Sequence, residues 1–119
     1  MDVNEVLRIT CEELKQSIDK GEDAVIIDTR NRKSYDNEHI EGALNINYSP
    51  SQFQMETEMI LSALPWNKLL VFYCDCTDDS DSALMALDLI NMGCEPDNVR
   101  ALSGGWLRWK ELGYPSEPV

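Results

Sequence analysis

Two continuous apolar runs constrain the fold of this chain more than any other feature. "AVII" (24–27) is followed by Asp28, and "LLVF" (69–72) is followed by Tyr73 and Cys74. Strands that are buried on both faces of a parallel sheet have this composition, because helices cover both sides of the sheet. Helical patterns separate the runs. We therefore expect an α/β fold with a central, mostly parallel five-stranded sheet and helices on both faces.

Three helices are marked by their end signals. Thr10 and Glu13 have the spacing of a capping box, and Gly21 is placed to end the helix that they begin. A second helix is predicted between Ser49–Pro50 and Pro65, and a third over 80–93. We also expect short strands at 6–9, near 44–46 and at 98–102, and a short helix over 104–113. The first few residues and 114–119 resemble tails.

Length and charge limit the possible functions. The chain has 119 residues and a formal net charge of −12, so we expect one domain over 1–119, present as a monomer or weak dimer. The negative charge argues against binding to nucleic acid or to an anionic membrane surface. The apolar runs are too short to span a bilayer, and the start of the chain has no signal-peptide pattern. We therefore expect a cytoplasmic protein.

The four cysteines do not have the spacing of a metal site. They are Cys11, Cys74, Cys76 and Cys94. A CxC pair with two isolated partners does not match the paired motifs of structural zinc sites, and the chain has a single histidine. We therefore expect thiols in a reducing compartment and no metal.

The segment that begins at Cys74 joins a buried strand directly to a helix. A loop in this position directs backbone N–H groups toward its centre, beside the positive end of the helix dipole. Such a loop can bind an anion or stabilise a thiolate. The alternative is that a cysteine at a strand end is a buried, inert thiol.

The sequence resembles the rhodanese-like family over about residues 6–117. The resemblance is carried by Asp-x-Arg, an aromatic residue, His-Ile-x-Gly-Ala, a strand ending Tyr-Cys, and Gly-Gly-x-x-x-Trp. These motifs stand here as Asp28, Arg30, Tyr35, His39–Ile40, Gly42–Ala43, Tyr73–Cys74, Gly104–Gly105 and Trp109. The resemblance implies a rhodanese-like α/β domain. It also implies a sulfurtransferase or persulfide carrier that moves sulfane sulfur from a small donor or a protein persulfide to a thiol-type acceptor.

The resemblance favours Cys76 as the nucleophile. Counted from Cys76 to Asp81, the loop has six residues, as in the family's sulfurtransferases, whereas a loop counted from Cys74 has eight. Cys74 stays open as an alternative nucleophile or as a resolving thiol, since side chains one residue apart in a strand share a face. The substrate-binding loop would then comprise Thr77, Asp78, Asp79, Ser80, Asp81 and Ser82. This chemistry needs no cofactor.

Acidic residues set this loop apart from the family pattern. Asp75, Asp78, Asp79 and Asp81 stand where active members commonly carry Arg or Lys, and no basic residue occurs from 69 to 99. Thiosulfate, a dianion, is therefore expected to be a poor donor. Alternatively, Asp79, Ser80 or Asp81 caps the helix. Two other functions stay open: a catalytically weak or inactive module that binds a protein, and a redox role for the CxC pair. A phosphatase is disfavoured, because its loop is one residue longer.

The remaining candidates have mainly structural interpretations. Asp28 and Arg30 form either the rim of the site or an ion pair that braces the loops. His39 is expected to be a brace rather than a general base. Trp106 and Trp109 are expected in the core rather than in a substrate wall. We expect the methionines on helices to be buried or half-buried filler: Met55, Met59, Met85 and Met92.

Overall fold

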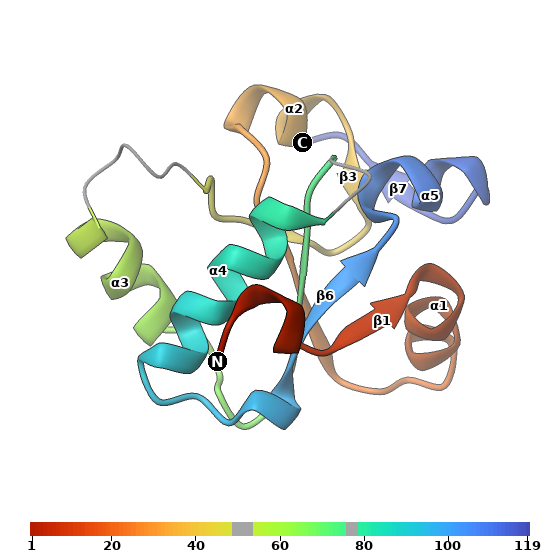
Figure 1. Ribbon diagram of the computed structural model, residues 1–119. Helices are drawn as coiled ribbons and strands as arrows, with labels where there is room; N and C mark the ends of the chain where they lie inside the picture. The colour runs from red at the N-terminus through yellow and green to blue at the C-terminus, as the bar shows by residue number, and fades with distance from the viewer. Residues whose placement is uncertain (49–53, 76–78) are drawn as a thin grey trace.

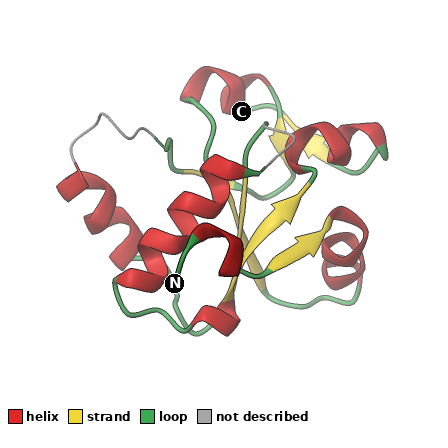
Figure 2. Cartoon of the chain, in the orientation of Figure 1, coloured by secondary structure: helices red, strands yellow, loops and turns green. Residues whose placement is uncertain are grey.

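The computed structural model describes residues 1–48, 54–75 and 79–119. Its central sheet has the order β1-β6-β5-β2-β4, and all neighbouring strands are parallel. The strands are β1 (Arg8–Thr10), β2 (Ala24–Asp28), β4 (Leu44–Asn45), β5 (Leu69–Tyr73) and β6 (Val99–Ser103). The α/β architecture with a five-stranded parallel sheet is therefore confirmed (Figure 2).

Helices cover both faces of this sheet (Figure 1). The α-helices are α1 (Cys11–Asp19), α2 (Arg32–Asn37), α3 (Gln54–Ser62), α4 (Ser80–Asn91) and α5 (Gly105–Glu111), and the 3-10 helices are η1 (Val3–Glu5) and η2 (Pro96–Asn98). α1 and α5 pack on one face, and α4 lies on the other with η1 and α3 against it. The predicted capping box is present: Thr10 accepts a hydrogen bond from the Glu13 N–H, and the Glu13 carboxylate accepts one from the Thr10 N–H.

The alternation of side chains along the strands divides the core into two layers. In β5, Leu70 and Phe72 pack with the α4 layer, whereas Val71 and Tyr73 pack with the α1–α5 layer. Successive strand residues point to opposite faces, so an uninterrupted apolar run fills both layers. The helix that begins at Cys11 completes one layer with Leu14, and α4 completes the other with Leu89.

The C-terminal segment is part of the fold, and the prediction that 114–119 is a tail was wrong. β7 (Ser116–Glu117) pairs antiparallel with β3 (His39–Ile40). The Glu117 carboxylate also accepts a hydrogen bond from the Gly42 N–H at 2.9 Å. The pairing of β3 with β7 joins segments far apart in the chain, so no local pattern predicts it.

The methionine prediction holds on α4 but not on α3. Met85 is fully buried, whereas Met55 and Met59 are 64% and 67% exposed. Among residues 55–62 of α3, Leu61 alone is fully buried, so this helix presents most of its surface to solvent. The predicted entry at Ser49–Pro50 lies outside the described residues, and the helix ends at Ser62 rather than at Pro65.

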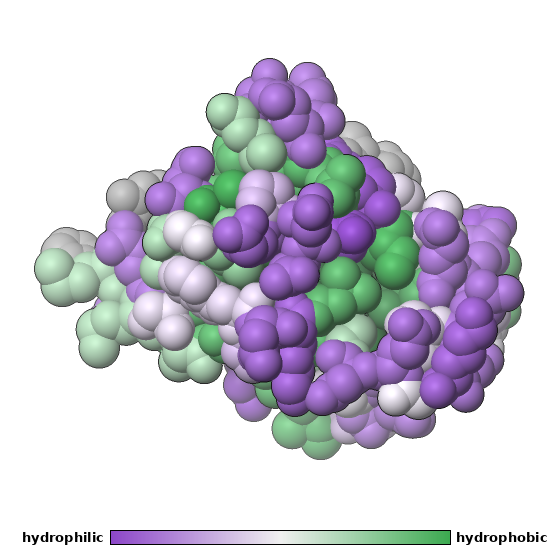
Figure 3. Space-filling view, turned by 90° about the horizontal axis from the view of Figure 1, so that it is seen from below, coloured by the Kyte–Doolittle hydropathy of each residue, from purple (hydrophilic) through white to green (hydrophobic). Residues whose placement is uncertain are grey.

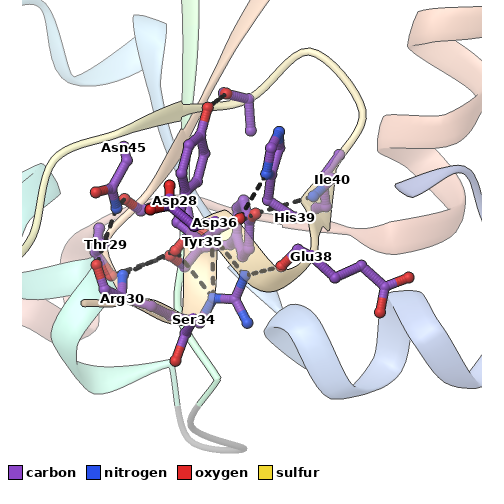
Figure 4. Close-up of polar contacts among 12 residues, drawn as sticks. Asp28, Thr29, Arg30, Ser34, Tyr35, Asp36, Glu38, His39, Ile40 and Asn45 are labelled. Carbon is purple, nitrogen blue, oxygen red and sulfur yellow. Dashed lines mark hydrogen bonds and ion pairs between the residues drawn. The ribbon is translucent and has the colours of Figure 1, made fainter. Parts of the chain in front are cut away.

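A buried polar network joins the carboxyl ends of β2 and β5. The Asp28 carboxylate is completely buried and accepts hydrogen bonds from Arg30 Nη2 at 2.8 Å and from the Tyr73 hydroxyl at 2.7 Å. The Tyr73 hydroxyl in turn accepts from the Ile40 N–H, and Arg30 donates a second bond to the Glu38 carbonyl. Figure 4 shows the Arg30 side chain extending between Asp28 and Glu38. The network therefore fixes the strand ends and the α2–β3 segment relative to one another.

Asp28→Asn should lower the free energy of unfolding by about 3–5 kcal/mol, because it leaves the Arg30 charge buried without its partner. Urea unfolding measures this change. Asp36→Asn is the matched control: it removes the exposed pair of Asp36 with Arg32, which is worth at most about 1 kcal/mol. Equal, small effects of the two substitutions would contradict the role given to the network.

The same network predicts an alkaline limit to stability. Burial and the charge of Asp28 raise the pKa of Tyr73. Above about pH 10 an unfolded tyrosine loses its proton, whereas the native phenol keeps it. The unfolded state then holds fewer protons, so the free energy of unfolding falls as the pH rises. Unfolding measured between pH 9 and 11 should show a shallower fall in Tyr73→Phe, and an unchanged slope would contradict this linkage.

Candidate active site

The candidate site lies where β5 ends and α4 begins. Cys74 directly follows β5 and is buried, with its Sγ 3.8 Å from the Ser82 Oγ in the first turn of α4. The Ser82 hydroxyl donates to the Asp79 carbonyl at 2.9 Å. The strand end at Cys74 and the first turn of α4 are therefore in contact.

Much of the predicted nucleophile loop lies outside the described residues. Cys76, Thr77 and Asp78 belong to this part, so nothing in the structure tests the choice between Cys76 and Cys74. Asp75, Asp79, Ser80, Asp81 and Ser82 are described. The contact between Cys74 and Ser82 shows that the register of α4 places its start beside the strand end.

Arg8 binds the acidic group at the end of this loop. Its Nε and Nη2 donate to the two carboxylate oxygens of Asp79 at 3.1 and 3.2 Å, and the Asp79 side chain is only 13% exposed. Asp79 occupies the N-cap position of α4 in a left-handed conformation (φ 53°) and makes no side-chain capping bond. Of the three candidates for a capping side chain, Asp79 is thus the N-cap residue, but its carboxylate binds Arg8 instead of the helix N–H groups.

No local sequence pattern predicts this ion pair. Arg8 lies on β1, 71 residues from Asp79, and its other nitrogen donates to carbonyls of the N-terminal segment at Val3 and Val6. The Arg8 side chain reaches the α4 layer because β1 lies at the edge of the sheet, beside β6. The positive charge beside Asp79 thus comes from Arg8, which lies outside the segment 69–99 that contains no Lys or Arg.

Arg30 lies close to the loop but is already engaged. Its side chain is 6% exposed and paired with Asp28. Burial lowers the pKa of Arg30, but the Asp28 hydrogen bonds and the negative charges of Asp28 and Asp75 outweigh burial and raise it. Arg30 thus braces the strand ends and lies within electrostatic range of Asp75.

Trp106 forms one side of the site. Its backbone N–H donates to the Cys74 carbonyl at 2.8 Å, and the Arg30 guanidinium lies 4.4 Å from the centre of its ring. The side chain is half-buried, whereas Trp109 is buried in the core and donates from its indole to the Pro115 carbonyl. Gly104 precedes α5 in a left-handed conformation (φ 81°), where an added Cβ would lie 2.6 Å from the Arg108 Cβ. The turn at Gly104 begins α5 at a point where the Trp106 N–H can donate to the Cys74 carbonyl.

His39 contacts the frame of the site. It is buried, and its Nδ1 lies 2.7 Å from the Tyr35 carbonyl, so that nitrogen donates its proton there. Its ring stacks on Tyr35 with centroids 3.9 Å apart. Its Nε2 lies 3.5 Å from the Glu117 carboxylate. These contacts join α2, β3 and β7.

Two further cysteines are buried away from the loop. Burial raises the pKa of the Cys11 thiol to about 11, with Glu12 adding to the effect and Arg108 opposing it. Burial also raises the pKa of Cys94. Both thiols are therefore poor nucleophiles at neutral pH. Within the described ranges, no three His, Cys, Asp or Glu side chains are grouped so that they could hold a metal ion.

Comparisons with known proteins agree with this architecture. A protein from Bacillus halodurans superposes with a TM-score of 0.79 at 22% identity, covering 97% of this chain and 79% of that one. The rhodanese-like domain of a protein from Anabaena sp. has a TM-score of 0.76 at 26% identity, covering 94% and 79%. A thiosulfate sulfurtransferase from Pseudomonas aeruginosa has a TM-score of 0.73 at 23% identity, covering 97% of this chain and 21% of that one.

The family model for the rhodanese-like domain matches residues 10–112, while no curated protein sequence matches the chain significantly. The match spans most of the chain, from the start of α1 to the end of α5. It includes the buried Asp28–Arg30 pair, the β3 histidine and the strand end at Cys74. The chain therefore belongs to the rhodanese-like domain family.

Proposed function

We propose that this protein is a sulfurtransferase or persulfide carrier whose nucleophile is Cys76. The observation that supports this is the contact of Cys74, at the end of β5, with Ser82 in the first turn of α4, which places the N-terminal end of the helix beside the strand end. The positive end of the helix dipole, together with loop N–H groups, can stabilise a thiolate or a terminal persulfide anion. The rhodanese-like family and its thiosulfate sulfurtransferase neighbour support the reaction class.

The proposed reaction transfers one sulfur atom in two balanced steps. The Cys76 thiolate attacks the outer sulfur of a donor persulfide, forming a new S–S bond while the S–S bond of the donor breaks and the donor leaves as a thiolate. An acceptor thiolate then attacks the terminal sulfur of the Cys76 persulfide. This step breaks the enzyme's S–S bond and regenerates the Cys76 thiolate. No electrons are gained from or lost to a third reactant, so no cofactor is needed.

The charges around the loop favour a protein persulfide or an uncharged donor over thiosulfate. Asp79 is neutralised by Arg8, and Arg30 is committed to Asp28. Neither cation is therefore available to hold a dianion in the way that a bidentate Arg holds an oxyanion. We place this chemistry in a reducing compartment, the cytoplasm, because the thiols that it uses stay reduced there. No helix among the described residues could cross a membrane.

Mass spectrometry after incubation with glutathione persulfide should find one added sulfur on Cys76. Cys76→Ser should lose the label, because the remaining thiols are buried. Cys11→Ser and Cys94→Ser should keep it and serve as controls. Cys74→Ser distinguishes the two roles of that residue: label retained with slower release to an acceptor thiol indicates a resolving thiol.

Undiminished labelling of Cys76→Ser would show that Cys74 is the nucleophile. Absence of label on every cysteine, with several donors, would favour the protein-binding module. A disulfide between Cys74 and Cys76 that forms and reduces reversibly would favour the redox role.

Arg8→Gln should slow alkylation of Cys76 at pH 7 by about 3–10-fold, because an uncompensated Asp79 three residues away disfavours the thiolate. The rate is followed against pH on the Cys76 peptide by mass spectrometry, and its midpoint should move upward. The double variant Arg8→Gln/Asp79→Asn should restore the rate, since it removes both charges.

Arg32→Gln is the control for this cycle, because it breaks an exposed ion pair on α2 instead. A purely structural role for Arg8 predicts no rescue by Asp79→Asn and no shift of the midpoint. Either of those results would contradict the electrostatic role.

A further inference from the structure

The outward face of α3 carries large apolar side chains. Met55 is 64% exposed, Met59 is 67% exposed and Ile60 is 50% exposed. Of the helix residues whose burial is described, 55–62, only Leu61 is fully buried. Figure 3 shows pale green surface on the side where α3 lies in Figure 1, whereas the opposite side is mostly purple.

The fold itself does not explain this face. A surface helix ordinarily directs polar side chains outward, and α1 does so with Glu12, Gln16 and Asp19. On α3, three apolar residues within six positions lie outward instead. Exposed apolar residues that stand alone are common, but a group of them on one element indicates a binding surface.

Negative charge surrounds these apolar side chains. Glu56 and Glu58 are exposed on α3 itself. Burial, and then the charge of Glu58, raise the pKa of Asp88, which shows that the acids of α3 and α4 act on one another. Neither helix carries a Lys or Arg, and Lys68 is the only Lys or Arg from 34 to 99. Lys68 is itself paired with Asp23 at 2.7 Å.

This charge pattern decides between possible occupants. A second copy of this chain would bring its own Glu56 and Glu58 against the same acids, and an anionic membrane would be repelled in the same way. A basic protein segment satisfies both features, because its aliphatic side chains cover the methionines while its Lys or Arg groups meet the acids. Methionine is flexible and polarizable, so it can fit side chains of different shapes.

We propose that the outward face of α3, formed by Met55, Met59 and Ile60 and bordered by Glu56, Glu58 and Asp88, docks a basic partner protein. The partner contributes a segment with aliphatic side chains flanked by Lys or Arg. This surface is independent of the cysteines, so the proposal holds whether or not Cys76 transfers sulfur. For a sulfurtransferase it would serve to hold the protein donor or acceptor, since α3 packs on the helix that begins at the loop.

A fluorescein-labelled model peptide tests the surface. The peptide has leucines on one helical face and lysines on the other, and in its matched partner glutamate replaces each lysine. Fluorescence anisotropy should give a Kd for the lysine peptide at least about tenfold below that of the glutamate peptide, with weaker binding at high salt. Amide shifts in an NMR titration should be largest on α3 and α4.

Two sets of variants locate the binding. Met55→Gln/Met59→Gln/Ile60→Gln should raise the Kd about tenfold and leave the thermal midpoint unchanged, because these side chains are exposed. Ile18→Gln/Leu107→Gln, at exposed apolar positions on α1 and α5, should leave the Kd unchanged. Glu58→Lys should weaken binding more than Glu22→Lys, although both change the net charge equally.

Several results would overturn the proposal. Equal affinity for the glutamate peptide, or equal effects of the two apolar variant sets, would show that α3 is not the binding surface. A wild-type dimer that the α3 variant dissociates would assign the surface to a second copy. Binding to phosphatidylcholine vesicles through α3, without binding to the lysine peptide, would assign it to a lipid surface.

Discussion

The buried pair of Asp28 and Arg30, completed by the Tyr73 hydroxyl, is the interaction on which the candidate site depends. Parallel strands end at one edge of the sheet, where their last polar groups face the interior and must be satisfied. The Asp28 carboxylate accepts hydrogen bonds from both Arg30 and Tyr73, and Arg30 extends the network by donating to the Glu38 carbonyl. Asn45 adds hydrogen bonds to the carbonyls of Asp28 and Arg30. The strand end that leads to Cys74 is therefore fixed from β2, from β4 and from the segment before β3.

This structural use of Arg30 has an electrostatic consequence for the loop. A guanidinium whose charge is balanced by a buried carboxylate attracts a substrate anion less strongly than an unpaired one does. Among the loop acids, Asp79 is compensated by Arg8, which reaches it from β1. Among the described residues, both of these cations are therefore paired with protein carboxylates.

Local signals predicted the elements, and long-range contacts explain what sequence reasoning missed. The Thr10–Glu13 capping box and the two apolar strands depend on neighbours in the chain, and the structure confirms them. The Arg8–Asp79 pair, the β3–β7 pairing and the exposure of Met55 depend on where distant segments meet. The sequence pattern around a helical methionine is the same whether its side chain packs in a core or faces solvent. Only the packing of α3 in the structure therefore shows that Met55 is exposed. The nucleophile's position could not be compared, since Cys76 lies outside the described residues.

The acidity of the chain connects the candidate site with the α3 surface. At a net charge of −12, the long-range field repels small anions and attracts basic proteins, raising their association rate. A dianionic donor would therefore be disfavoured for two reasons. The negative field would repel it as it approaches, and the two described arginines near the loop, Arg8 and Arg30, are already paired with carboxylates. A basic protein that carries a persulfide meets neither obstacle, because the field guides it and its sulfur arrives as part of a larger, oppositely charged surface. The same acidic residues that would repel thiosulfate would thus attract a basic protein partner.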